Sequence, residues 1–140
     1  MDDRDYVLAR IDPWIEKYFS AGPSALSPLE VVGVGVWMLE AEVNNGGFDQ
    51  YYFNSAGDLA LQTVVALKAI GAENTASLLS AANAEFLNSV PPVNRAERQE
   101  ALDRIREKVR FASLEEEFYR DEEDLLSCLA SYLRLHVGDG

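Results

Sequence analysis

Residues 40–58 of the chain read EAEVNNGGFDQYYFNSAGD. A glycine pair, Gly46-Gly47, separates an apolar stretch from a dense group of aromatic residues, Phe48, Tyr51, Tyr52 and Phe53. The amide residues around those aromatics are Asn44, Asn45, Gln50 and Asn54. This composition predicts a tight junction, with Phe48, Tyr51 and Phe53 in the core. The amides either satisfy the backbone of the turn or bind a partner.

A long helix is predicted before this junction. Ser27-Pro28-Leu29-Glu30 is a capping-box pattern with proline in the first turn. Apolar residues then recur at spacings of three and four up to Val43. We expect a helix of about 16 residues. It should end at the glycine pair, where glycine can adopt the left-handed cap. Gly33 and Gly35 lower its intrinsic helix propensity, which indicates that another element packs closely there.

Apolar spacing predicts five further helices. The first should begin at Asp12 as N-cap, because Pro13 is tolerated in a first turn but not in a helix interior. The others are expected over residues 59–70, 74–87, 95–110 and 113–137. The capping residues expected at the last three starts are Asn74 or Thr75, Asn94, and Ser113. Since no alternating strand pattern is present, the sequence predicts an all-α, single-domain bundle of about six helices over residues 1–140.

Composition limits the class of function. The chain has 24 acidic and 12 basic residues, a net charge of −12, so it should repel nucleic acid and anionic membranes. With one cysteine and one histidine, an intrachain disulfide and a Cys/His zinc site are not expected. No signal-peptide or membrane-helix pattern is present, so we expect a cytoplasmic protein. A monomer without cofactor is the expected state.

The acids are unevenly distributed. Residues 18–94 contain seven acids and one base, Lys68, and residues from Ser113 onward contain eight acids and two bases. This pattern is typical of a solvated helix face, but it also fits a row of carboxylates that imitates a phosphate backbone. The candidate partner-binding residues are Glu115, Glu116, Glu117, Asp121, Glu122, Glu123, Asp124, Glu40, Glu42, Asp49 and Asp58.

Catalytic and metal sites have weaker support. Glu40, Glu42 and Asp49 carry oxygen atoms that could bind a divalent metal or transfer protons. Glu40 and Glu42 are two positions apart, about 200° around a helix, so they do not face one site. The glycine pair also lacks the spacing of a phosphate-binding loop. We therefore expect no enzyme activity.

The run from Glu42 to Gly57, EVNNGGFDQYYFNSAG, resembles the signature of a bacterial DNA-mimic protein family, first described as a domain of unknown function. The residues that carry the resemblance, expected to be structural, are Asn44, Asn45, Gly46, Gly47, Phe48, Gln50, Tyr51, Phe53, Asn54 and Gly57. The resemblance implies an all-helical, non-enzymatic cytoplasmic protein. Its negative surface would occupy the DNA-binding face of a transcription factor and relieve repression.

Three hypotheses follow. The leading one is an acidic protein that binds a basic DNA-binding protein, such as a transcriptional repressor, through the acids named above. The second is an immunity or antitoxin-like module that neutralises a toxin through the junction Asn44–Asn54. The third is a hydrolase or metal enzyme that uses Glu42 and Asp49.

Overall fold

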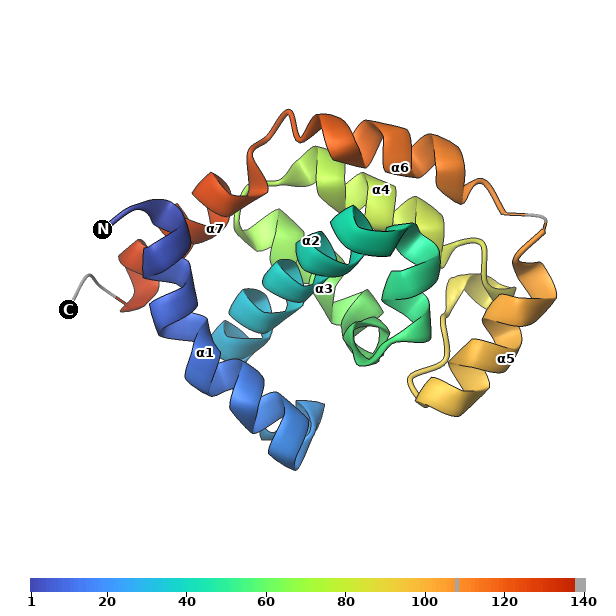
Figure 1. The fold of residues 1–140 in the computed structure, drawn as a ribbon, viewed down its shortest axis with the longest axis horizontal. Coiled ribbons are helices and arrows are strands. Elements are labelled where there is room, and N and C mark those ends of the chain that lie inside the picture. Colours follow the sequence, from blue (N-terminus) through green and yellow to red (C-terminus); the bar gives the residue numbers. More distant parts are fainter. Residues whose placement is uncertain (108, 138–140) are drawn as a thin grey trace.

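The computed structural model describes residues 1–107 and 109–137, and these residues form an all-helical fold without strands (Figure 1). The described residues form seven α-helices rather than six. They are α1 (Asp3–Ala21), α2 (Pro28–Phe53), α3 (Ala60–Ala69), α4 (Glu73–Asn83), α5 (Arg95–Ile105), α6 (Phe111–Arg120) and α7 (Leu125–Val137). Short 3₁₀ turns are η1 (Pro23–Ala25), η2 (Ser55–Leu59) and η3 (Leu87–Ser89). The expected all-α class is thus confirmed for the described residues.

Helix α2 is the central element, and it packs against α1, α3, α5, α6 and α7. Its start agrees with the prediction: Ser27 accepts a hydrogen bond from the Glu30 amide, and the Glu30 carboxylate accepts one from the Ser27 amide. The predicted end at the glycine pair is confirmed as a break in the helical geometry, although the helix does not stop there. The chain kinks at Gly46 and Gly47 and resumes a helical path to Phe53. Gly47 has φ +74° and ψ −174°, a conformation that glycine adopts easily but that is not the expected left-handed cap.

The first helix is longer than expected. Helix α1 begins at Asp3, with Asp2 as N-cap, and Pro13 lies inside it rather than in its first turn. Buried residues on both sides of the proline, such as Val7 and Tyr18, pack into the same core. Pro13 itself is exposed, and the burial of these residues outweighs the roughly 3 kcal/mol that an interior proline costs.

The C-terminal acidic stretch is two helices rather than the single one that we predicted. It breaks at residues 121–124, where Asp121 and Asp124 have φ of +46° and +53°. The Asp121 carboxylate accepts a hydrogen bond from the Leu125 amide, and the Asp124 carboxylate accepts one from Ser127. These local bonds stabilise the start of α7 and offer the chain an alternative to a continuous helix.

Other helix ends also differ from the predictions. Helix α6 starts at Phe111, with Arg110 rather than Ser113 at the N-cap position. Helix α4 starts at Glu73 without a local side-chain cap, so neither Asn74 nor Thr75 has the predicted role. The predicted Asn94 cap of α5 is confirmed, although α5 ends at Ile105.

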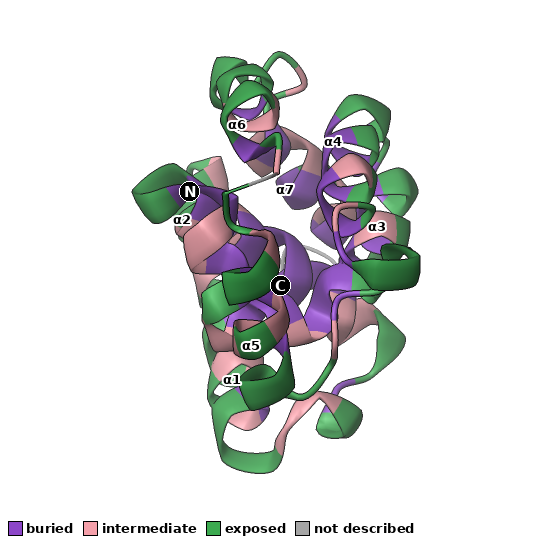
Figure 2. Cartoon of the chain, turned by 90° about the vertical axis from the view of Figure 1, so that its right-hand side faces the viewer, coloured by how far each residue is buried: buried purple, intermediate pink, exposed green. Residues whose placement is uncertain are grey.

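One continuous core joins the seven helices (Figure 2). Phe48, Tyr51 and Tyr52 are fully buried, and the Phe48 ring contacts those of Phe111 and Phe118. The prediction that Phe53 anchors the turn is wrong, since this ring is 44% exposed. Positions 48, 51 and 52 share one helix face, and position 53 is rotated away from it.

A buried arginine ties the junction to α5. Arg98 is fully buried and donates hydrogen bonds to the carbonyl oxygens of Tyr52 (2.6 Å) and Asn54 (2.8 Å). Its Nη1 atom also lies 2.9 Å from Oδ1 of Asp58. A Cβ atom on Gly57 would lie only 2.6 Å from Arg98 Nε, so the signature glycine provides space for this side chain.

We predict that Arg98→Met lowers the free energy of unfolding by about 3–5 kcal/mol, because it leaves Asp58 and several buried carbonyl oxygens without their donor. Chemical denaturation followed by circular dichroism measures the effect. The matched control is Arg104→Met on the same helix, where the side chain is exposed, and it should change stability by less than about 0.5 kcal/mol. Equal effects of the two substitutions would contradict the assigned role of Arg98.

Candidate partner-binding surface

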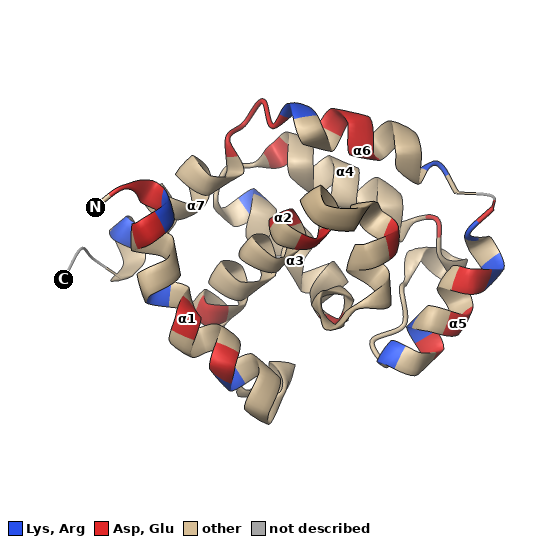
Figure 3. Cartoon of the chain, in the orientation of Figure 1, with Lys and Arg blue, Asp and Glu red and all other residues tan. Residues whose placement is uncertain are grey.

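The C-terminal candidate acids lie along α6 and the connection 121–124, which we call the acidic edge (Figure 3). Glu116, Glu117 and Glu122 are exposed, and no donor among the described residues bonds to them. Their carboxylates are directed only to solvent or to a partner. The other acids of this edge also stabilise the fold.

Glu115 holds the kink of α2. Its carboxylate accepts a hydrogen bond of 2.7 Å from the Phe48 amide, which starts the second half of α2 after the glycine pair. A Cβ atom on Gly47 would collide with that carboxylate. The close contact explains the glycine at position 47, and it makes Glu115 a cap supplied by another helix.

Glu123 caps α4 from the connection between α6 and α7. Its two carboxylate oxygens accept hydrogen bonds of 2.8 Å from the Asn74 and Thr75 amides, and a further one from the Thr75 hydroxyl. Burial opposes the charged form, but these three bonds outweigh it and lower the pKa of Glu123.

Glu73, absent from the predicted set, is exposed in the first turn of α4 and extends the acidic edge. The helix predicted here began after Glu73, so the sequence did not place this acid in a first turn.

The junction acids bond within the chain. Glu42 accepts hydrogen bonds from the amides of Gln50 (2.6 Å) and Asn54 (3.1 Å). Asp49 pairs with Arg106 at 2.6 Å. Asp58 pairs with buried Arg98 and accepts a hydrogen bond from the Tyr18 hydroxyl. The structure therefore brings these three acids into contacts within the chain rather than onto the acidic edge.

The signature amides mostly follow the structural interpretation. Asn45 donates to Gln50, and Asn54 accepts from Arg95 while its own amide donates to Glu42. Asn44 is exposed. Burial of Gly47, Phe48, Tyr51 and Gly57 agrees with a structural role for these signature residues.

Glu40 differs from the other acids. It is half-buried and accepts no hydrogen bond from any described residue. Burial raises the pKa of its carboxyl, with further contributions from nearby Asp121 and Asp124, and Arg4 partly offsets this. Glu40 thus interacts electrostatically both with the acidic edge and with Arg4 of α1.

The described residues also bear on metal binding and on membrane insertion. Among the described residues, no group of three potential ligand side chains is placed to hold a metal ion. No described helix has the length and apolar character needed to cross a membrane.

We predict that Glu115→Ala lowers the free energy of unfolding by about 1–3 kcal/mol, because it leaves the partly buried Phe48 amide without its acceptor. Its neighbour Glu116 is exposed, so Glu116→Ala is the matched control and should be nearly neutral. Thermal and urea denaturation at pH 7 compare the two variants. A neutral Glu115→Ala would show that the kink holds without this cap.

We also predict a pH effect at Glu123. Because its folded-state pKa is below the ordinary value of 4.5, its stabilisation is complete above pH 4.5 and is lost as the pH falls through the folded-state pKa. Glu123→Gln should reduce stability at pH 7 and flatten the decline in acid. Denaturation midpoints from pH 7 to pH 3 measure this, with exposed Glu122→Gln as the control. Parallel curves for wild type and Glu123→Gln would refute the prediction.

The model of the DMP19-like protein family matches residues 24–136 of this chain. No curated protein and no solved structure matches it. Since the matched residues make up most of the chain, and include the glycine kink, the buried aromatics and the acidic edge, the chain belongs to the DMP19-like protein family.

Proposed function

We propose that this protein is an acidic DNA mimic that binds a basic DNA-binding protein, such as a transcriptional repressor, and blocks its access to DNA. The observation that carries the proposal is the acidic edge. It presents the solvent-directed carboxylates of Glu116, Glu117 and Glu122 beside the capping carboxylates of Asp121 and Asp124. The resemblance to a DNA-mimic family supports the same function.

The capping bonds make this surface suitable for recognition. Asp121, Glu123 and Asp124 are each held by backbone amides, so their charges keep fixed positions. A duplex carries one phosphate charge per about 1.7 Å of its axis, and a DNA-binding protein presents its Lys and Arg side chains to that array. Preordered carboxylates reduce the side-chain entropy that binding would otherwise cost.

Basic residues do not neutralise the acidic edge. Three arginines in and after α5 are occupied within the chain: Arg98 is buried, Arg106 pairs with Asp49, and Arg110 pairs with Glu85. Helix α5 lies at the opposite end of the molecule from α1 and α7 (Figures 1 and 3). Half of the chain's twelve basic residues thus fall within residues 95–110, and Arg120 is the only base within residues 115–124.

Affinity capture tests the proposal. The immobilised protein is exposed at low salt to lysate of the source organism, and bound proteins are eluted with a salt gradient and identified by mass spectrometry. We expect a basic DNA-binding protein that loses more than about tenfold in affinity between 50 and 200 mM salt. Duplex DNA should compete for it. A toxin-like enzyme retained through high salt would favour the junction Asn44–Asn54 and overturn the proposal.

Charge reversal identifies the surface. The triple variant Glu116→Lys, Glu117→Lys and Glu122→Lys should weaken binding of the captured partner by at least about tenfold, because attraction becomes repulsion. The matched control reverses three exposed acids of α5 or the turn after it, and it changes the net charge equally. These control residues are Glu97, Glu100 and Glu107. If both triple variants weaken binding equally, net charge alone is responsible and the acidic edge is not the binding surface.

A further inference from the structure

A hollow of about 180 Å³ lies between the start of α1 and the middle of α2, beside the acidic edge. It is lined by Arg4, Trp37, Glu40, Ala41 and Asn44. The lining thus includes one acidic residue, one indole ring and one amide residue. This combination suits the end of a long cationic side chain.

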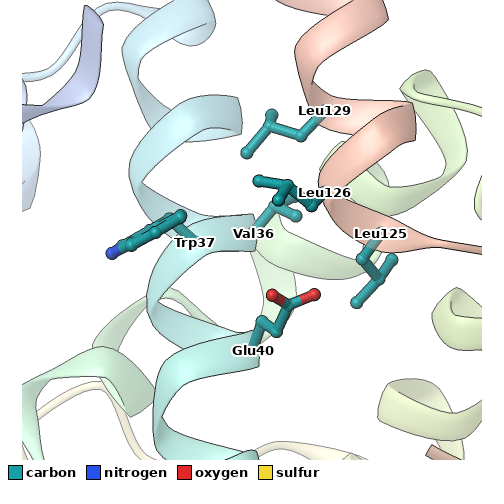
Figure 4. Close-up of a pocket in the computed structure, with 6 residues that line it drawn as sticks. All are labelled: Val36, Trp37, Glu40, Leu125, Leu126 and Leu129. Atoms are coloured by element: carbon teal, nitrogen blue, oxygen red, sulfur yellow. The ribbon is translucent and has the colours of Figure 1, made fainter. Parts of the chain in front are cut away.

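Glu40 lines this hollow and also borders the first turn of α7. Figure 4 shows its carboxylate directed toward the first turn of α7, among Val36, Leu125 and Leu126, while Trp37 extends in another direction. The space on the α7 side leaves no volume for a water-sized group. A group that neutralises Glu40 therefore has room in the hollow and none on the α7 side.

The carboxylate lacks a close cation. No described Lys or Arg lies within ion-pair distance of Glu40. The charged groups around it are Asp121 and Asp124 from the connection and Arg4 from α1. Burial and the two aspartates raise the pKa of Glu40, which means that the site favours either a proton or another positive charge.

Arg4 shows which kind of cation the hollow accepts. Its guanidinium lies 5.5 Å from the centre of the Trp37 ring, a cation–π distance. The Arg4 side chain is exposed and forms no ion pair with a described acid. A cation from outside can displace it and approach Glu40 more closely.

We propose that this hollow receives one arginine or lysine side chain of the basic partner, with the cation over the Trp37 ring in place of Arg4 and the Glu40 carboxylate turned from α7 toward it. The proposal rests on the proposed function, and it specifies one anchoring contact beside the more general attraction of the acidic edge. Asp121 and Asp124 would attract the incoming charge.

A small probe tests the hollow without the partner. N-acetyl-L-arginine amide is titrated into the ¹⁵N-labelled protein, and the indole N–H signal of Trp37 is followed by NMR. The other tryptophan, Trp14, serves as the internal reference. We expect saturable shifts at Trp37 and a fall in the pKa of Glu40. The uncharged isostere N-acetyl-L-citrulline amide should cause neither change.

Variants define the roles of the two charged side chains. Glu40→Gln should weaken binding of the arginine probe by about fivefold or more, because it removes the anionic partner. Arg4→Ala should strengthen binding, because it removes the competing guanidinium. Glu117→Gln and Arg120→Ala are controls that change charge by the same amounts at exposed positions of the acidic edge, and they should have much smaller effects. Unchanged binding in Glu40→Gln, or equal shifts with the citrulline probe, would overturn the proposal.

The two proposals fail in different ways. If the arginine probe binds at Trp37 but lysate yields no basic DNA-binding partner, the hollow stands as a cation receptor and the proposed function fails. If a salt-sensitive basic partner is captured but the Glu40→Gln variant binds both it and the probe normally, the receptor fails and the proposed function stands.

Discussion

The fold depends on a hydrogen bond between the Glu115 carboxylate and the Phe48 amide at the glycine kink. The kink redirects α2, so that Phe48, Tyr51 and Tyr52 enter the core beneath α6. Without an acceptor there, the new helix start would leave partly buried amides unsatisfied. The positive φ of Gly47 makes the bend possible, and the acid from α6 stabilises it.

Capping of helix starts by carboxylates explains why so many acids can gather in a stable domain. Glu115 and Glu123 are placed at helix starts, where backbone amides and the helix dipole favour negative charge. Asp121 and Asp124 likewise accept hydrogen bonds from backbone amides at the start of α7. Their mutual repulsion is offset locally, and the chain retains a dense negative surface in which Arg120 is the only base within residues 115–124. Structural capping and a role in recognition are therefore compatible in the same residues.

Glu40 marks the limit of this arrangement. It has no amide donor, it lies partly buried beside two aspartates, and burial raises its pKa. In the free protein, this position disfavours the charged form of the Glu40 carboxyl group. A cation supplied by a partner would remove that penalty, which is why the hollow beside Trp37 is of interest for binding.

Short-range signals in the sequence were sufficient for the fold class, the Ser27 and Asn94 caps, and the resemblance that led to the family. Each depends on residues a few positions apart. Tertiary structure alone determined the continuation of α2 and the roles of the acids. Glu115 caps an amide 67 positions away, and Glu123 caps one 48 positions away. In the sequence such residues look like any solvated glutamates, because helix propensity and apolar spacing contain no information about which distant amide a carboxylate will meet.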